Sequence, residues 1–292
     1  MTDIQSYKKI IEPYNTKDSV ISILIRKING ETFFEQNSTI KVNSASCIKV
    51  VIMIAILKKV ELKEISLNED IIFKNSTLIG YSGIYNEVEK HASLLELLTF
   101  MIINSDNLAT NVLIDLFGFD YYNDYFKEIG LVDTELNRYM GVYNLNKENY
   151  TSNKDMFYLF KKLFRGQLFN NELSSVAKNI LIKQRSKNAS QRYISSDIEV
   201  YHKTGGLSYL NLRNDCGCFK LNGEFYYFGF FTEKMLSKEA ASILIGKLFK
   251  KIFNDIKKIY VLTLIKLVKN HIIINELYFY YKDVRKMSKK FT

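Results

Sequence analysis

Two side chains near the start of an apolar stretch have the types and spacing that acyl-transfer chemistry needs. Ser46 and Lys49 form a Ser-x-x-Lys tetrad, and a spacing of three places both side chains on one face of a predicted helix. Burial and cationic neighbours lower the pKa of a lysine, and a helix N-terminus favours a developing alkoxide. The tetrad therefore predicts a serine nucleophile activated by a lysine, without histidine.

The order of further motifs strengthens this interpretation. The tetrad alone is weak, because the same pattern occurs at residues 6–9 and 38–41. However, Ser105-Asp106-Asn107 follows between two predicted helices, and Lys203-Thr204-Gly205 closes a strand predicted for residues 198–202. Three short motifs in this order are far rarer by chance than one.

With these three motifs, the chain resembles the class A β-lactamases and the penicillin-binding proteins. The resemblance covers about residues 5–256. It extends to Tyr81-Ser82 before the second motif, to Leu108-Ala109-Thr110-Asn111 after it, and to Arg213-Asn214-Asp215 on the strand after Lys203. It implies an acyl-serine intermediate formed with a β-lactam or a D-alanyl-peptide-like amide.

The resemblance also implies a role for each matching residue. Ser46 would be the acylated nucleophile, Lys49 its base, and Ser105 the relay of a proton to the leaving nitrogen. Other residues would hold the substrate. Asn107 would bind its side-chain amide, Asn144 would contribute from the loop, and Tyr81 would form a wall of the cleft. The substrate carboxylate would be bound by Lys203, Thr204 and Arg213, and the oxyanion by the backbone N–H groups of Ser46 and Gly206. Gly205 and Gly206 lack side chains, which lets a substrate lie against the strand.

One part of the family pattern is missing. In the β-lactamases a loop Glu activates the deacylating water, with a proline after it and an Asn further on. Aligning residues 133–138 with the entry of that loop puts Met140 at the Glu, Gly141 at the proline and Asn144 at the Asn. A methionine can neither accept a proton nor orient water. The acylation half of the site is therefore expected to be complete and deacylation to be slow.

A rival alignment of this loop stays open. Asp133 and Asn137 keep the Glu-to-Asn spacing, although this alignment loses the match at Arg138. Glu135 and Glu148 are interpreted as bystanders. Under the rival alignment Asp133 would serve as the deacylating base.

The elements that must position these motifs form an α+β pattern. Two hairpins are predicted around Asn29-Gly30 and Asn222-Gly223, after a short N-terminal helix. Between them, apolar periodicity predicts helices over residues 46–61, 94–103, 107–116, 120–129 and 154–163. We therefore expect one antiparallel sheet built from both chain ends, covered by a helix over 237–256, with an all-α lobe inserted.

The predicted domain limits follow from this pattern. Residues 1–44 and 191–256 form an α/β lobe, residues 45–190 an all-α lobe, and residues 257–292 a basic C-terminal extension. The last segment holds nine Lys or Arg against two acidic residues, and so most of the formal charge of +10. We interpret it as a solvated helix, with an anionic membrane surface as the alternative partner.

Composition excludes other classes. With 292 residues, 47% hydrophobic residues and one proline, the chain has the profile of a folded globular protein. His91, His202 and His271 lack metal-ligand spacing, and His202 and Cys47 are assigned structural roles. We expect no metal, no cofactor, no nucleic-acid partner and a monomer.

Localisation is predicted from the termini and cysteines. The first ten residues contain no apolar signal region, and the three cysteines are an odd number. A cytoplasmic protein is expected, or an exported one if a signal has been removed.

Two functions remain open at this stage. The first is a β-lactamase-like serine hydrolase that uses Ser46. The second is a penicillin-binding, sensor or scaffold module without turnover, whose basic tail binds a surface.

Overall fold

The computed structural model describes residues 4–73, 91–142, 147–195 and 197–288, with the backbone alone for residue 264 and residues 266–288. The chain divides into two compact units, residues 1–250 and 251–292. All the described strands lie in the first unit. Tyr81 and Asn144, which the sequence assigns to the site, and Ser82 lie outside the described residues.

Two strand-rich segments flank a mainly helical segment along the chain, and a long helix follows them. The α-helices are α1 (Ile4–Ile11), α2 (Ile48–Glu61), α3 (Leu94–Ile103), α4 (Asn107–Glu128), α5 (Asn153–Phe164), α6 (Asn171–Leu181) and α7 (Lys238–Ser288), and short 3₁₀ helices are η1 (Glu12–Tyr14), η2 (Ala45–Cys47), η3 (Ser190–Tyr193) and η4 (Ser208–Leu210). The strands are β1 (Val20–Lys27), β2 (Thr32–Gln36), β3 (Val42–Asn43), β4 (Asp70–Ile72), β5 (His91–Ser93), β6 (Tyr150–Thr151), β7 (Val200–Leu207), β8 (Leu212–Leu221) and β9 (Glu224–Glu233).

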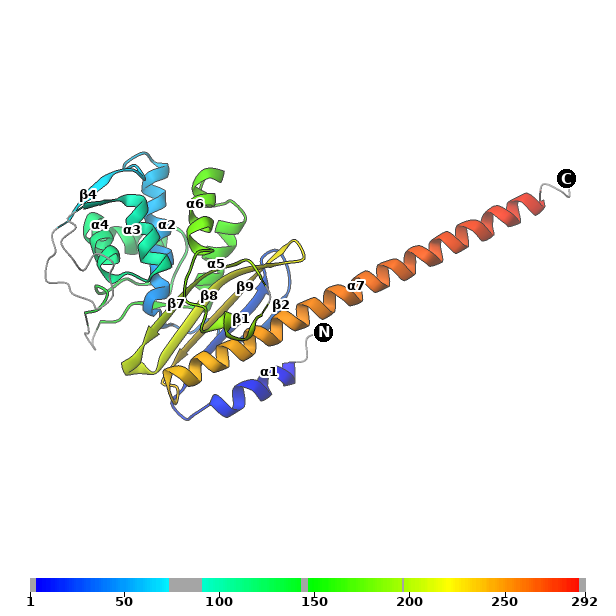
Figure 1. The fold of residues 1–292 in the computed structure, drawn as a ribbon, viewed down its shortest axis with the longest axis horizontal. Helices are drawn as coiled ribbons and strands as arrows, with labels where there is room; N and C mark the ends of the chain where they lie inside the picture. The colour runs from blue at the N-terminus through cyan, green and yellow to red at the C-terminus, as the bar shows by residue number, and fades with distance from the viewer. Residues whose placement is uncertain (1–3, 74–90, 143–146, 196, 289–292) are drawn as a thin grey trace. The chain divides into compact units, whose positions relative to one another are not determined.

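One five-stranded antiparallel sheet joins the two ends of the first unit. Its strand order is β2-β1-β9-β8-β7, so the N-terminal hairpin pairs with the last strand through β1 and β9. The helices α2 to α6 are inserted between β3 and β7, and Figure 1 shows them on one side of the sheet. This architecture confirms the predicted α+β fold with a sheet built from both chain ends.

The two predicted hairpins form, but with different turns. Asn222 and Gly223 have φ of 54° and 80°, and they connect Leu221 directly to its partner Glu224. This is the two-residue turn that an Asn-Gly pair favours. At Asn29-Gly30 the connection takes four residues, and the register of β1 shifts between Ile25 and Arg26. The bulge absorbs the extra residues of this turn.

The helices agree with the sequence prediction in one place and differ from it in two. The helices predicted over 107–116 and 120–129 both form, within α4, and are separated by a kink at Gly118, whose φ of 76° is not helical. The helix α6 has no counterpart among the predicted helices. The covering helix does not end at residue 256, because α7 continues to Ser288.

Aromatic side chains pack on both faces of the sheet. On one face, the ring centroid of Phe249 of α7 lies 4.8 Å from that of Phe228 and 5.2 Å from that of Phe219. On the other face, Tyr227 packs against Phe157 of α5 at 5.4 Å. The sheet is therefore covered on both faces, by α7 on one face, as predicted, and by α5 on the other.

The helix α2 runs through the interior of the helical block. Its residues from Ile48 to Leu57 are all fully buried. A helix that is apolar all round is buried all round. Its first turn consequently places Lys49 in the interior. Among the described residues, no helix is both long and apolar enough to cross a membrane.

Candidate active site

The segment before α2 positions Ser46. The Asn43 side chain accepts a hydrogen bond from Ala45 N at 2.9 Å, and Ala45 has a φ of 43°. Ser46 lies in η2 and is half-buried, with its backbone N 3.0 Å from the point where a Cβ on Gly205 would lie. A side chain at 205 would crowd the Ser46 backbone, so glycine suits this close approach of β7 to the serine.

Lys49 is fully buried behind this turn. Its Nζ donates to Ser105 O at 2.7 Å and to Asn107 Oδ1 at 2.8 Å, and it lies 3.3 Å from Ser105 Oγ. Burial, and then the positive charge of Lys203, hold the pKa of Lys49 well below its ordinary value. Within the described part of the chain, no hydrogen bond joins Lys49 Nζ to Ser46 Oγ. Lys49 is thus a buried amine that contacts the second motif directly.

The second motif occupies a strained turn between α3 and α4. Ser105 has a φ of 58°, which is uncommon for a residue with a side chain. Asp106 stabilises the turn by accepting a hydrogen bond from Ala109 N at 2.8 Å, as the N-cap of α4. The cap fixes the turn, and the turn directs Ser105 and Asn107 towards Lys49.

The third motif lies inside β7 and does not close it. The strand begins at Val200 and continues to Leu207, so the expected end at residue 202 is wrong. β7 is the edge strand of the described sheet. Lys203 is fully buried, donates from Nζ to Thr204 O at 2.8 Å, and has a pKa lowered to about 8, chiefly by burial.

Arg213 on β8 is held by a loop that the sequence motifs do not include. It is 8% exposed, and its Nη2 donates to Ser186 Oγ at 2.8 Å and to Asn188 Oδ1. Its Nε is buried without a hydrogen-bond partner among the described residues. The guanidinium therefore has a fixed direction and one unused donor.

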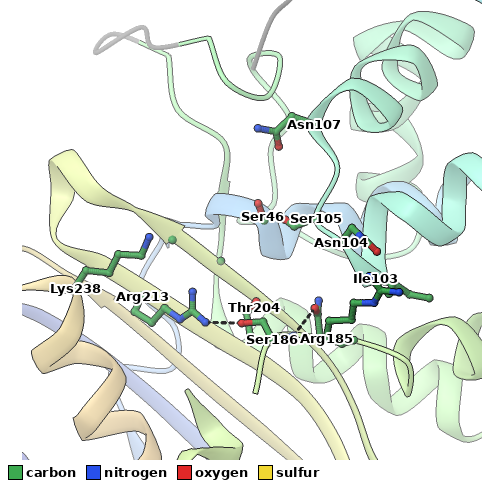
Figure 2. Close-up of a pocket in the computed structure, with 13 residues that line it drawn as sticks. Ser46, Ile103, Asn104, Ser105, Asn107, Arg185, Ser186, Thr204, Arg213 and Lys238 are labelled. Atoms are coloured by element: carbon green, nitrogen blue, oxygen red, sulfur yellow. Dashed lines mark hydrogen bonds between the residues drawn. The ribbon is translucent and has the colours of Figure 1, made fainter. Parts of the chain in front are cut away.

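A pocket of about 520 Å³ collects most of these residues (Figure 2). Seven predicted site residues line it: Ser46, Ser105, Asn107, Thr204, Gly205, Gly206 and Arg213. Lys49 and Lys203 are not among the lining residues, since both are buried behind the wall. The structure thus brings the three motifs to one place.

The sequence interpretation missed six lining residues: Ile103, Asn104, Gln184, Arg185, Ser186 and Lys238. Ile103 and Asn104 immediately precede the second motif, which could have indicated them. Residues 184–186 lie in the loop after α6, and Lys238 begins α7. These four have no local pattern that marks them, because only the folded chain carries them to the pocket.

The side chain of Asn111 holds the backbone of Met140 in place. Asn111 of α4 accepts from Met140 N at 2.8 Å and donates to Met140 O at 3.0 Å. The Met140 side chain is buried and belongs to the hydrophobic core. It does not line the described pocket.

The nearby carboxylates are engaged in contacts outside the pocket lining. Glu148 is buried and bonds Arg138 at 2.7 Å, Asn43 at 3.0 Å, and Tyr209. Glu135 pairs with Lys41 at 2.6 Å, which together with hydrogen bonding lowers the pKa of Glu135.

Asp133 lies in the segment between α4 and β6 and contacts the first turn of α5 through its backbone. Its backbone N donates to Asp155 Oδ2 at 2.8 Å. These contacts give Glu135 and Glu148 structural partners, and Asp133 is not among the pocket residues.

His202 and the cysteines lie in the interior. His202 Nδ1 lies 2.8 Å from Asp215 Oδ1, and both residues are buried. Cys47 is buried, with Sγ 3.3 Å from Lys203 O. Cys47, Cys216 and Cys218 are all free thiols. Within the described residues, no three His, Cys, Asp or Glu side chains gather where they could hold a metal ion.

Solved structures share this fold. A β-lactamase from Sphaerobacter thermophilus matches with a TM-score of 0.80 at 25% identity, over 87% of this chain and 97% of that chain. The penicillin-binding protein PBP-A matches with a TM-score of 0.78 at 22% identity, over 87% and 96% of the two chains. A variant of PBP-A is described as an acyl-enzyme complex with penicillin G.

Sequence comparisons extend the likeness beyond the fold. β-Lactamase BRO-1 of Moraxella catarrhalis is 31% identical over 185 residues, which is 60% of this chain. That match spans 56% of the relative's own length. The family model described as the β-lactamase enzyme family matches residues 5–256, which include all three motifs. The chain therefore belongs to the β-lactamase enzyme family.

Proposed function

We propose that this protein is a serine hydrolase that opens β-lactams, or D-alanyl-peptide-like amides, through an acyl-Ser46 intermediate. The observation that carries the proposal is the buried Lys49 amine, with its lowered pKa, at hydrogen-bonding distance from Ser105 and Asn107 beside Ser46. A neutral amine is a base, whereas an ammonium is not. The lowered pKa increases the neutral fraction of Lys49, which can therefore work as a base.

Acylation begins with attack by Ser46 Oγ on the amide carbonyl carbon. The serine proton passes to Lys49, and the oxyanion is stabilised by the backbone N–H groups of Ser46 and Gly206. Ser105 Oγ then donates its proton to the departing nitrogen as the C–N bond breaks, and it recovers a proton from Lys49 Nζ, 3.3 Å away. Thr204 and Arg213 hold the substrate carboxylate on the opposite side of Ser46 from Asn107, which contacts the acyl side chain. Lys203 adds its positive charge from behind the pocket wall.

Deacylation lacks an evident base. Water must attack the ester of acyl-Ser46, and a carboxylate would normally take its proton. Met140 stands where the family pattern has this carboxylate, Glu135 and Glu148 are paired with Lys41 and Arg138, and Asp133 does not line the described pocket. We therefore infer a long-lived acyl-enzyme and slow release of the product.

A penicillin-binding module without turnover is the second candidate, and the same Met140 favours it. In that case acyl-Ser46 is the end point and the basic segment 257–292 binds an anionic surface. The two candidates share acylation and differ only in the rate of release.

Intact mass after mixing with penicillin G tests both candidates. The related PBP-A variant forms an acyl-enzyme with this compound, which makes it a suitable probe. We expect the protein mass to rise by one penicillin, a burst of one product equivalent per site and a slow phase with the adduct still present. Ser46→Ala should abolish the adduct, and the matched controls Ser38→Ala and Ser6→Ala should retain it.

Two results would overturn these assignments. Labelling that survives Ser46→Ala would remove Ser46 as the nucleophile. Rapid multiple turnover without an accumulating adduct would show that Asp133 or another residue supplies the base.

A further inference from the structure

The pocket carries more positive charge than one substrate carboxylate needs. Arg185, Arg213 and Lys238 line it, and no Asp or Glu is found among its described lining residues. The proposed function uses Lys203 and Arg213 for the carboxylate. Lys238 and Arg185 are left without a role, and Arg185 is exposed at the rim, where solvent weakens its field.

Lys238 is the better placed of the two surplus cations. It lies at the first position of α7 and is half-buried, and its side chain extends along β7. Its Cε and Nζ lie 2.8 Å and 3.2 Å from the point where a Cβ on Gly206 would be. The end of the Lys238 side chain therefore packs against Gly206, next to the strand against which the substrate would lie.

Lys238 has no paired carboxylate of its own. Within the described residues, its ammonium has no ion pair and donates no hydrogen bond. Burial, and then the positive charge of Arg213, lower the pKa of Lys238. The charges of Asp215 and Glu239 act on Arg213, but neither forms an ion pair with Lys238. Two cations that face each other repel, and an anion bound between them reduces that repulsion.

Arg213 supplies a second, independent indication. Its Nη2 is engaged by Ser186 and Asn188, whereas its Nε is buried and has no hydrogen-bond partner. Buried donors are almost always paired in folded proteins. An acceptor from a ligand would satisfy this donor.

The position of these groups in the pocket assigns them to one part of the substrate. Figure 2 shows Asn107 on the opposite side of Ser46 from Arg213, Ser186 and Lys238. Under the proposed function, Asn107 contacts the acyl side chain, and Arg213 contacts the part that carries the carboxylate. The surplus charge therefore faces the leaving portion of the substrate.

We propose that Lys238, together with Arg213, forms a second anion subsite, and that the preferred acyl donor has a second acidic group on its leaving portion. This inference rests on the proposed acylation of Ser46. In β-lactam chemistry such a donor is a cephalosporin with an acidic substituent at C3, in addition to its ring carboxylate. In peptide chemistry it is an amide whose leaving amino acid is itself acidic.

Three cephalosporins with the same acyl side chain and a C3 substituent that is anionic, neutral or cationic test the proposal. The measured quantity is the second-order rate constant for acyl-Ser46 formation, followed by intact mass in the full-length protein. We expect wild type to react about tenfold faster with the anionic than with the neutral compound, and slowest with the cationic one. Added salt should reduce this preference.

Variants of Lys238 test whether this residue causes the preference for the anionic compound. Lys238→Gln should remove the tenfold preference and leave the rate with the neutral compound within about twofold, and Lys238→Glu should favour the cationic compound. Lys250→Gln is the matched control, because it removes one exposed positive charge from the same helix outside the pocket. The burst amplitude with the neutral compound reports the fraction of folded sites in each variant.

The outcomes separate the two proposals. If the neutral compound fails to acylate Ser46 in wild type, the proposed function is wrong, and the subsite falls with it. If it acylates Ser46 but the anionic compound has no advantage, the subsite alone is wrong. The subsite is also wrong if Lys238→Gln keeps the preference, or if Lys250→Gln loses it equally.

Discussion

The turn that carries Ser105 and the segment that carries Met140 are both held by side-chain clamps, but they present different chemistry. At Ser105, the Asp106 cap holds a strained turn, and the side chains contact a buried amine. At Met140, the Asn111 amide holds the backbone from both sides, and the side chain is apolar. The fold thus supports a backbone position independently of the reactivity of the side chain placed there.

The two regions also differ in how their buried charges are arranged. Around Lys49 and Lys203, burial shifts both pKa values downward, so protonation can change during a reaction. Around Met140, the buried charges of Arg138 and Glu148 neutralise each other at 2.7 Å. The first region can exchange protons, whereas the second stabilises a loop. Experiments that alter one region should therefore spare the other.

The largest effect is expected at the amine itself. Lys49→Met should slow acyl-Ser46 formation by about 10⁴, because it removes the general base. In wild type the acylation rate should rise with pH as Lys49 loses its proton, and this limb should vanish in the variant. The wild-type acylation rate should fall again above about pH 8, where Lys203 loses the positive charge that attracts the carboxylate from behind the pocket wall. A pH profile of acylation by intact mass measures both limbs. Acylation of Lys49→Met at the wild-type rate would contradict the assigned base.

Loss of the buried ion pair between Arg138 and Glu148 should lower the free energy of unfolding and leave acylation of Ser46 largely unchanged. Arg138→Met leaves the Glu148 carboxylate buried without its ionic partner, and loss of one partner of such a pair costs about 3 to 5 kcal/mol. Urea unfolding measures the free energy of unfolding. The double variant Arg138→Met/Glu148→Gln should recover part of the loss. A single variant as stable as wild type would show that the pair contributes nothing to the loop.

A carboxylate at position 140 should supply the base for hydrolysis of acyl-Ser46 that a methionine cannot provide. Met140→Glu is expected to speed hydrolysis of acyl-Ser46 by about 10², the lower end of general-base catalysis, with acylation unchanged. Met140→Gln is the matched control, since it has nearly the same shape and no base. The decay of the adduct in intact mass gives the rate. Equal acceleration by both variants would show that polarity, and not proton transfer, is responsible.

The carboxylate contact should matter less than the base. Arg213→Ala should cost about 1.5 to 3 kcal/mol in acylation by a β-lactam with a carboxylate, because a charge-assisted hydrogen bond is lost. A neutral ester should lose much less. Equal slowing of both substrates would remove Arg213 from the carboxylate site.

The smallest effect is expected at the C-terminus. Truncation after Ile256 should leave acylation of Ser46 unchanged, because residues 257–292 lie beyond the family match. The acylation rate and the urea midpoint of the truncated protein measure this. Binding of full-length protein to anionic vesicles should weaken with salt if the tail binds surfaces. Loss of acylation on truncation would place the tail in the folded core.

Local sequence signals were sufficient for the elements that carry the motifs. The Asn222-Gly223 pair selects a two-residue turn because both residues tolerate positive φ, and the apolar run after Ser46 forms a buried helix. The signals failed where neighbours decide the outcome. The strand of Lys203 continues to Leu207, past the predicted end at residue 202, because β8 pairs with it along its whole length.

The sequence by itself determined the order of the three motifs, and this order predicts the nucleophile, its base and the carboxylate contacts proposed above. Only the tertiary structure decided what surrounds them. The pKa of Lys49 depends on burial by segments distant in sequence, the direction of Arg213 depends on Ser186 and Asn188, and Lys238 reaches Gly206 only because α7 begins beside β7. Spacing along a chain specifies local geometry, whereas desolvation and charge proximity arise from contacts between remote residues.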